Sequence, residues 1–164
     1  MTKIDKKRRL ENKTDYRARI TLLKSGKPRI VIRKTNKYIS MQYVKSIEAK
    51  DKALVGLTSF ELLKHGWPKD LVGSLKSIPA CYLTGYLAGK KIIEKTKNSD
   101  AIVDLGLQRN VHGSRIYASI KGLIDAGIKI KVDEKVFPSK ERLSGKDVNK
   151  GVKEAFEKVK ANLK

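Results

Sequence analysis

Hydrophobic and polar residues alternate along three stretches of the first third of the chain: residues 17–24, 28–34 and 37–44. Alternation is the period of a β-strand that buries one face, so each stretch predicts a strand with aliphatic side chains inward and cations outward. Residues 53–58 predict a fourth strand, and residues 59–64 a short helix after it. Because the segments between the strands are short, we expect an antiparallel meander.

The rest of the chain carries apolar residues at helical spacing. Residues 79–96 predict one helix, and a second runs from Ser114 to Gly127, a residue type suited to a helix end. A short apolar run at 101–105 predicts a buried strand between the two helices, and residues 128–132 predict another. A meander followed by alternating helices and strands predicts an α/β fold, with one twisted mixed sheet and helices packed on it.

These signals divide the chain into three parts. Residues 1–14 have almost no apolar content and predict a basic flexible arm. Residues 15–134 form the predicted α/β domain, in which residues 66–77 are expected to be a loop. Residues 135–164 comprise a polar connector and a C-terminal helix over 147–163, whose apolar side chains share one face and are expected to pack on the same domain.

The net charge points to a polyanionic partner. The 164 residues include 38 Lys and Arg against 17 Asp and Glu, a formal charge of +21. The first 37 residues hold 14 of these cations and three acids, a net +11. Such a field favours nucleic acid over a membrane surface, because the basic segment has the period of a strand and not that of an amphipathic helix. A single cysteine, Cys81, excludes an internal disulfide, and without a spanning or secretory segment we expect a cytoplasmic protein.

The cationic face of the predicted sheet is the main candidate for binding. Arg17, Arg19, Arg29 and Arg33 are expected to project together from two neighbouring strands. A guanidinium presents a planar set of donors to phosphate oxygens, and no carboxylate interrupts residues 16–47. Since an ordinary solvated face mixes both signs, this pattern favours contacts with phosphates, which position a nucleic acid without reading its sequence.

A second candidate lies where the helix at Ser114 begins. Backbone N–H groups at a helix N-terminus form an anion site, although Ser114 could equally be a plain cap. Tyr16 lies among the cations, and either stacking on an unpaired base or packing on the protein explains it. The expected RNA-binding residues are Arg8, Arg9, Lys13, Tyr16, Arg17, Arg19, Lys27, Arg29, Arg33, Lys34, Asn36, Lys37, Arg109, His112, Gly113, Ser114 and Arg115.

Catalysis has little support in the sequence. His65 and His112 are isolated, there is no phosphate-binding loop motif, and Cys81 lies on the apolar stripe of a predicted helix. We therefore expect no catalytic residue, no metal and no cofactor. Two alternatives stay open: a metal-dependent nuclease with Asp104 as a metal ligand, and an RNA chaperone that binds RNA without specificity.

Five blocks of sequence resemble a known family. They are residues 13–19, 27–37, 80–91, 113–118 with 125–127, and 138–142, and they occur in the expected order over most of the chain. The sequence resembles the archaeal and eukaryotic type of large-subunit ribosomal protein eighteen, which binds 5S ribosomal RNA. No single block decides this resemblance, but the five together are specific.

The resemblance implies a fold similar in outline to ribonuclease-H-like domains and a structural role. Members of the family are not enzymes, and they hold 5S rRNA in the central protuberance of the large ribosomal subunit. The implied partners are 5S rRNA, the large-subunit rRNA and neighbouring ribosomal proteins, with no membrane and no small-molecule substrate. By the same resemblance, the arm, the first hairpin and the helix start at Gly113–Arg115 would carry the RNA contacts.

Overall fold

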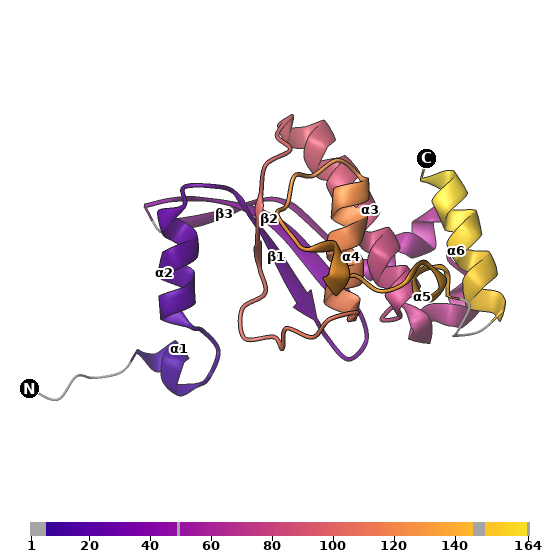
Figure 1. Cartoon of the computed structure of the whole chain (residues 1–164), viewed down its shortest axis with the longest axis horizontal. Helices are drawn as coiled ribbons and strands as arrows, with labels where there is room; N and C mark the ends of the chain where they lie inside the picture. The colour runs from indigo at the N-terminus through magenta and orange to yellow at the C-terminus, as the bar shows by residue number, and fades with distance from the viewer. Residues whose placement is uncertain (1–5, 49, 146–149, 164) are drawn as a thin grey trace, which may run out of the picture.

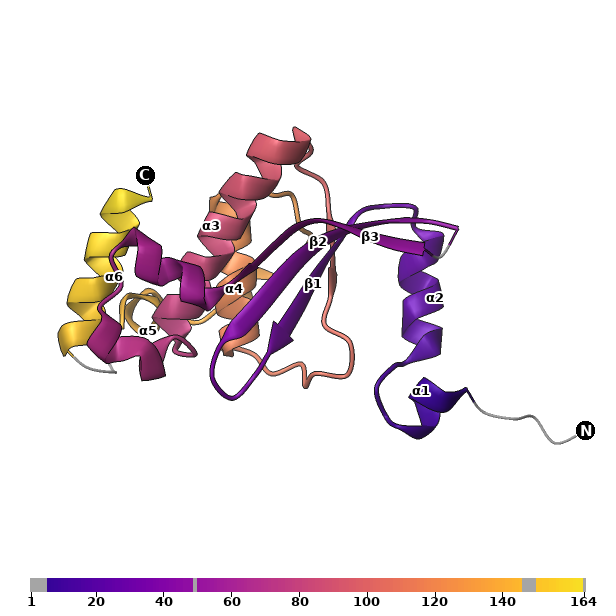
Figure 2. The same cartoon turned by 180° about the vertical axis from the view of Figure 1, so that it is seen from behind.

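The protein is an α/β structure built on one open four-stranded sheet (Figures 1 and 2). A computed structural model describes residues 6–48, 50–145 and 150–163. The elements in chain order are α1 (Lys7–Leu10), α2 (Tyr16–Lys24), β1 (Arg29–Lys34), β2 (Ile39–Ile47), β3 (Lys50–Thr58), two 3-10 helices η1 (Ser59–His65) and η2 (Lys69–Ser74), α3 (Ile78–Thr96), β4 (Ile102–Asp104), α4 (Arg115–Asp125), the 3-10 helix η3 (Glu134–Val136), α5 (Lys140–Ser144) and α6 (Lys150–Asn162).

The sheet has the strand order β3-β2-β1-β4. Strands β1, β2 and β3 pair antiparallel, as the short connections predict, and β4 adds to β1 in parallel. Ile30 and Ile32 of β1 and Met41 of β2 are buried on the inner face, so the alternation placed these side chains correctly. The predicted α/β class with a mixed sheet is confirmed.

Helices α3 and α4 lie against each other and cover the inner face of the sheet. Glycine permits their close crossing. A Cβ atom on Gly85 would lie 2.1 Å from the carbonyl oxygen of Ser119, and one on Gly122 would lie 2.1 Å from the carbonyl oxygen of Tyr82. Each helix therefore presents backbone to the other, without a side chain between them.

The C-terminal helix α6 packs on the same domain, as its apolar face predicts. Val152, Ala155, Phe156, Val159 and Leu163 are buried in the common core. The ring of Phe156 lies 5.8 Å from that of Tyr82 on α3. Val148 and Asp147, which the sequence assigns to the first turn of this helix, lie outside the described residues.

The strand predicted at residues 17–24 is wrong, because this segment forms α2. One oxygen of Asp15, Oδ1, accepts hydrogen bonds from the backbone N–H groups of Arg17 at 2.9 Å and Ala18 at 3.1 Å, which caps the helix. Ala, Arg and Leu also favour helix, and among the described residues the segment is not part of the sheet. Ile20, predicted to be buried, is 51% exposed.

The strand predicted at residues 128–132 is also wrong. The segment makes one isolated parallel bridge, between Lys129 and Asp100, which precedes β4, and it adds no strand to the sheet. Asp133 explains why the chain does not continue as a strand, because its side chain accepts a hydrogen bond from the backbone N–H of Lys135 and caps η3.

The segment after β3 differs from prediction in two places. The short helix expected at residues 59–64 is the 3-10 helix η1, and the expected loop at 66–77 contains η2. The Ser59 hydroxyl does not cap η1 and instead accepts a hydrogen bond from the backbone N–H of Ile39 at 3.3 Å. Gly66 ends η1 at φ 102°, as a glycine at this position predicts.

Candidate nucleic-acid interface

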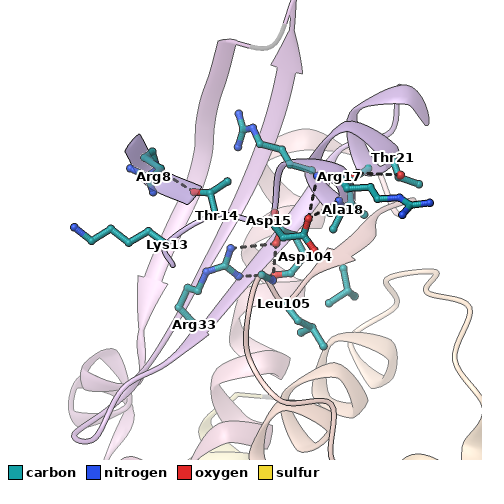
Figure 3. Close-up of a pocket in the computed structure, with 14 residues that line it drawn as sticks. Arg8, Lys13, Thr14, Asp15, Arg17, Ala18, Thr21, Arg33, Asp104 and Leu105 are labelled. Carbon is teal, nitrogen blue, oxygen red and sulfur yellow. Dashed lines mark hydrogen bonds and ion pairs between the residues drawn. The ribbon is translucent and has the colours of Figure 1, made fainter. Parts of the chain in front are cut away.

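A basic cleft of about 630 Å³ lies between α2 and the end of β4 (Figure 3). Segments that are distant in sequence meet there: the residues before α2, α2 itself, β1, and β4 with the residues that follow it. Two carboxylates, Asp15 and Asp104, also line the cleft. Its five cationic side chains are Arg8, Lys13, Arg17, Arg19 and Arg33, all of them in the set expected from the sequence.

Helix α2 is held against the sheet by an ion pair with the start of strand β3. The Nη2 atom of Arg19 lies 2.8 Å from Oδ2 of Asp51, at the start of β3. Both side chains are 33% exposed. Arg17, two residues earlier, has no side-chain partner among the described residues. The same helix thus offers one arginine that anchors it and one that is available to a ligand.

The prediction that Arg29 projects outward into solvent is wrong. Its side chain is on the face of the sheet opposite Ile30 and Ile32, but the residue is 1% exposed. Its Nη1 donates to Oδ2 of Asp104 at 2.9 Å, and its Nη2 donates to Oδ1 of Asp51 at 2.7 Å. The guanidinium is occupied by protein carboxylates, so Arg29 is a structural residue of the sheet and is not part of an exposed cationic face.

Arg33 lies at the floor of the cleft and is 40% exposed at its side chain. Its Nη1 donates to the carbonyl oxygen of Asp104 at 2.8 Å, and its Nη2 lies 3.1 Å from Oδ1 of the same residue. The guanidinium packs against Gly106, where a Cβ would lie 2.9 Å from Nη2. Gly106, at φ 59°, lets the chain turn under the arginine.

These contacts form one chain of alternating charges: Arg19, Asp51, Arg29, Asp104 and Arg33. Burial alone would raise the pKa of Asp51, but hydrogen bonds from Ser46, Arg19 and Arg29 outweigh burial and lower the pKa below its usual value. The chain fixes α2, the β2–β3 hairpin and β4 relative to one another, and so sets the width of the cleft.

A second hollow, of about 490 Å³, lies beside the cleft and contains Tyr16. Arg9 and Leu107 line it as well. The Nζ atom of Lys6 lies 4.5 Å from the centre of the Tyr16 ring, in cation–π geometry. Tyr16 is partly buried, so part of its side chain is exposed at this hollow. Tyr43, another tyrosine of the basic segment, is 2% exposed and belongs to the core.

The loop from Leu105 to Ser114 connects the cleft to the start of α4. Midway along it, the side-chain Nε2 of Gln108 donates to the carbonyl oxygen of Lys34 at 3.2 Å. Burial raises the pKa of the Cys81 thiol, and the positive charges of Arg115 and Lys34 partly oppose this rise. Asn36 and Lys37 are exposed in the turn after β1.

The start of α4 is arranged without a conventional side-chain cap. Ser114 occupies the N-cap position, but its hydroxyl makes no capping hydrogen bond and is buried without a partner in the described part of the chain. Gly113, at φ 65°, donates its N–H to the carbonyl oxygen of Val136. Arg142 of α5 comes close to Gly113, a neighbour that no local sequence signal indicates. Arg109 and His112 are exposed nearby.

Lys27 lies apart from this surface. It borders a second groove, whose lining includes Ile102, Ile128 and Ile130 and which shares Val103 and Leu105 with the cleft. Apart from Lys27 and Arg29, seven of the expected residues line the cleft or the adjoining hollow, and the remaining eight lie at the end of β1, in the turn after it, or between Arg109 and the start of α4.

The described residues offer little for metal-dependent chemistry. Among them, no group of three or more His, Cys, Asp or Glu side chains is arranged to hold a metal ion. Asp104, the proposed nuclease ligand, already accepts from Arg29, Arg33 and the N–H of Gly106. In the same part of the chain, no helix has the length and apolar content to cross a membrane.

The chain is similar in sequence to a known protein family. A family model described as "Ribosomal large subunit proteins 60S L5, and 50S L18" matches residues 2–102. The chain is 42% identical over 146 residues to "Large ribosomal subunit protein uL18" of Korarchaeum cryptofilum, covering 89% of this chain and 72% of that relative. It is 43% identical over 139 residues to the uL18 protein of Methanoculleus marisnigri, covering 85% and 77% of the two chains.

These relatives are named as ribosomal proteins and not as enzymes, which confirms the expectation of a non-catalytic role. The matched region includes α1, α2, the whole sheet except the last residues of β4, and helix α3. It therefore contains most of the basic cleft. On this evidence, the chain belongs to the uL18 family of large ribosomal subunit proteins.

Proposed function

We propose that this ribosomal protein binds 5S rRNA and helps to attach it to the large rRNA in the central protuberance. The observation that carries the proposal is the convergence of five Arg and Lys side chains on one cleft, next to a partly exposed tyrosine. Guanidinium and ammonium groups neutralise phosphates and release counterions, and this release drives the binding of RNA. The shared family supports the choice of 5S rRNA over other RNAs.

The proposed contact surface comprises the cleft, the hollow beside it, the turn after β1 and the start of α4. The cleft holds Arg8, Lys13, Arg17, Arg19 and Arg33, and the hollow beside it adds Arg9 and Tyr16. The turn contributes Lys34, Asn36 and Lys37, and the start of α4 contributes Arg109, His112, Gly113, Ser114 and Arg115. The Ser114 side chain makes no capping hydrogen bond in the described part of the chain, so a phosphate oxygen would accept from the first N–H groups of α4 in its place. Residues 1–14 would act as an arm that extends the contact area.

Arg29 is not included in this surface, because its side chain is only 2% exposed and its guanidinium is occupied by Asp51 and Asp104. Arg19 and Arg33 pair with the same carboxylates but remain 33% and 40% exposed. Lys27 would make at most a peripheral contact, since it borders a different groove. The neighbouring partners would be large-subunit rRNA and other ribosomal proteins, and the ribosome-bound chain would reside in the cytoplasm.

A competition experiment tests the proposal. Labelled 5S rRNA from the same genome is bound to the full chain at physiological salt and challenged with unlabelled 5S rRNA or with random-sequence RNA of equal length. We expect 5S rRNA to compete far better than the random RNA. Equal competition would replace the proposal with that of a general RNA chaperone.

The salt dependence tests the electrostatic mechanism separately. With roughly six to ten phosphates neutralised, affinity should fall about a thousandfold or more between about 50 and about 200 mM salt. A flat dependence would contradict the proposed role of the cationic cleft.

A further inference from the structure

The cleft between α2 and β4 has apolar walls inside its cationic rim. Ala18 and Leu22 line it from α2, and Val103 and Leu105 line it from the β4 side. The cations lie around these walls: Arg17 on α2, with Arg8 and Lys13 in the residues before it (Figure 3). Phosphates are bound by cationic and polar groups, so contacts with a phosphate backbone alone do not account for the apolar walls.

The size of the cleft fits a single small ligand. Its volume of about 630 Å³ lies within the range of roughly 300 to 1,000 Å³ that holds small molecules in proteins. A paired base cannot enter such a slot, because it remains stacked inside the helix. An unpaired base can be splayed out of an RNA loop or bulge and inserted between protein side chains.

The two carboxylates of the cleft differ in what they can still accept. Asp104 is largely occupied, since its Oδ2 accepts from Arg29 and its Oδ1 accepts from Arg33 and from the N–H of Gly106. Asp15 uses one oxygen, Oδ1, to cap α2, and Oδ2 has no hydrogen-bond partner among the described residues. The open acceptor of Asp15 is thus available to an N–H donor on a ligand.

We propose that the cleft receives one unpaired nucleotide of the bound RNA, with its base between the apolar walls of α2 and β4 and its phosphate at the rim near Arg17. Asp15 then favours a base with an amino group, because an amino group donates to the carboxylate and a carbonyl repels it. Cytosine and uracil are the sharpest comparison, since they have the same size and differ at the group on C4. This inference rests on the proposed RNA-binding function and assigns it a specific pocket.

Three RNA hairpins test the proposal on the full chain. They share one stem and carry a single bulged cytidine, a single bulged uridine or no bulge. We expect the bulged cytidine to bind most tightly, by about tenfold over the fully paired hairpin, the size of one base contact. The bulged uridine should lie between them. Equal affinity for all three hairpins at the same salt would overturn the inference.

Two variants separate the slot from the charge. Ala18→Trp fills the slot from an exposed helix position, so it should lower the affinity for the bulged hairpins to that of the paired one and leave the paired hairpin unchanged. Asp15→Asn keeps a good helix cap and should abolish the preference for cytidine over uridine. An equal loss for all hairpins in Ala18→Trp, or a retained preference in Asp15→Asn, would contradict the inserted base.

Failure of the pocket assignment can be distinguished from failure of the proposed 5S rRNA binding. If the chain binds 5S rRNA specifically and Ala18→Trp binds it equally well, the pocket assignment fails and 5S rRNA binding stands. If the wild-type chain shows no preference for 5S rRNA, the function fails, whatever the hairpins show about the slot.

Discussion

Arg29 and Asp104 form a buried ion pair across the parallel strands β1 and β4, with Nη1 of the arginine 2.9 Å from Oδ2 of the carboxylate. The side chains are 2% and 11% exposed. The pair joins the last strand of the sheet to its neighbour below the cleft. It also changes the expected consequence of a mutation at Arg29, because the loss of Arg29 removes a cation from both Asp51 and the mostly buried Asp104 and leaves each with one arginine partner among the described residues.

Arg29→Ala should therefore destabilise the fold, by about 3–5 kcal/mol, the usual cost of breaking a buried ion pair from one side. Urea unfolding followed by circular dichroism measures the change. The matched control is Arg33→Ala, whose side chain is 40% exposed and which should cost far less stability. Similar urea unfolding curves for Arg29→Ala and the wild type would show that the fold tolerates the removal of the arginine from Asp51 and Asp104.

Arg17→Ala should weaken binding to 5S rRNA and leave stability nearly unchanged. Its guanidinium has no partner among the described residues, and alanine preserves the helix. Loss of one phosphate contact should reduce the slope of log affinity against log salt by about 1. Lys158→Ala is the matched control, since it removes one exposed charge from α6, at the other end of the molecule (Figures 1 and 2). The same slope change in both variants would mean that net charge alone matters.

Stability should fall in acid through Asp51. Because the pKa of this carboxyl is lowered in the folded protein, its ionised form stabilises the fold above the unfolded pKa, about 4, and this contribution is lost as the pH falls through the lower, folded value. Asp51→Asn should be less stable at neutral pH and should show a flatter dependence of unfolding free energy on pH. Parallel pH profiles for the variant and the wild type would rule Asp51 out as the titrating group.

Gly85→Ala should disrupt the crossing of α3 and α4. The added Cβ would lie 2.1 Å from the carbonyl oxygen of Ser119, a contact that backbone movement must relieve, and overpacking of this kind costs about 1–3 kcal/mol or more. In Gly73→Ala the added Cβ meets no atom within 4 Å, so its stability should change by no more than about 0.5 kcal/mol. Thermal melts of both variants measure the difference, and equal melting temperatures would contradict the close approach.

The thiol of Cys81 should be unreactive in the folded protein. Burial raises its pKa to about 12, so at neutral pH the thiolate that reacts with disulfide reagents is scarce. Labelling by a chromogenic disulfide reagent should be slow under native conditions and fast in urea. Rapid labelling of the folded chain would show that α3 opens locally.

Long segments with a clear period were predictable from the sequence. The alternation in β1 and β2 and the helical stripes of α3, α4 and α6 extend over enough residues for one period to dominate. Helix α2 has nine residues, and its first half reads equally well as a strand. Asp15 before a run of Ala, Arg and Leu was the signal that could have identified it, since Asp is a preferred helix cap.

The site was less predictable than the fold, because long-range contacts decide it. Nothing near Arg29 in the sequence indicates burial, and its side-chain partners Ser46, Asp51 and Asp104 are 17, 22 and 75 residues away. The cations around the cleft were identified by charge, but their meeting with Leu105 and Gly106 depends on where β4 joins the sheet. The unpartnered hydroxyl of Ser114 also has no local sequence signal.

The backbone contact between α3 and α4 has a consequence for the energetics of assembly. Since Gly85 and Gly122 leave no side chain between the helices, α4 is held against α3 at Ser119 and Gly122 and moves with α3 as one unit. The start of α4 belongs to this unit, so the surface there is preorganised and little conformational entropy is lost when RNA binds. The affinity for RNA at the start of α4 should then depend on how well the RNA fold fits this rigid protein surface. Such a surface should discriminate among RNA folds.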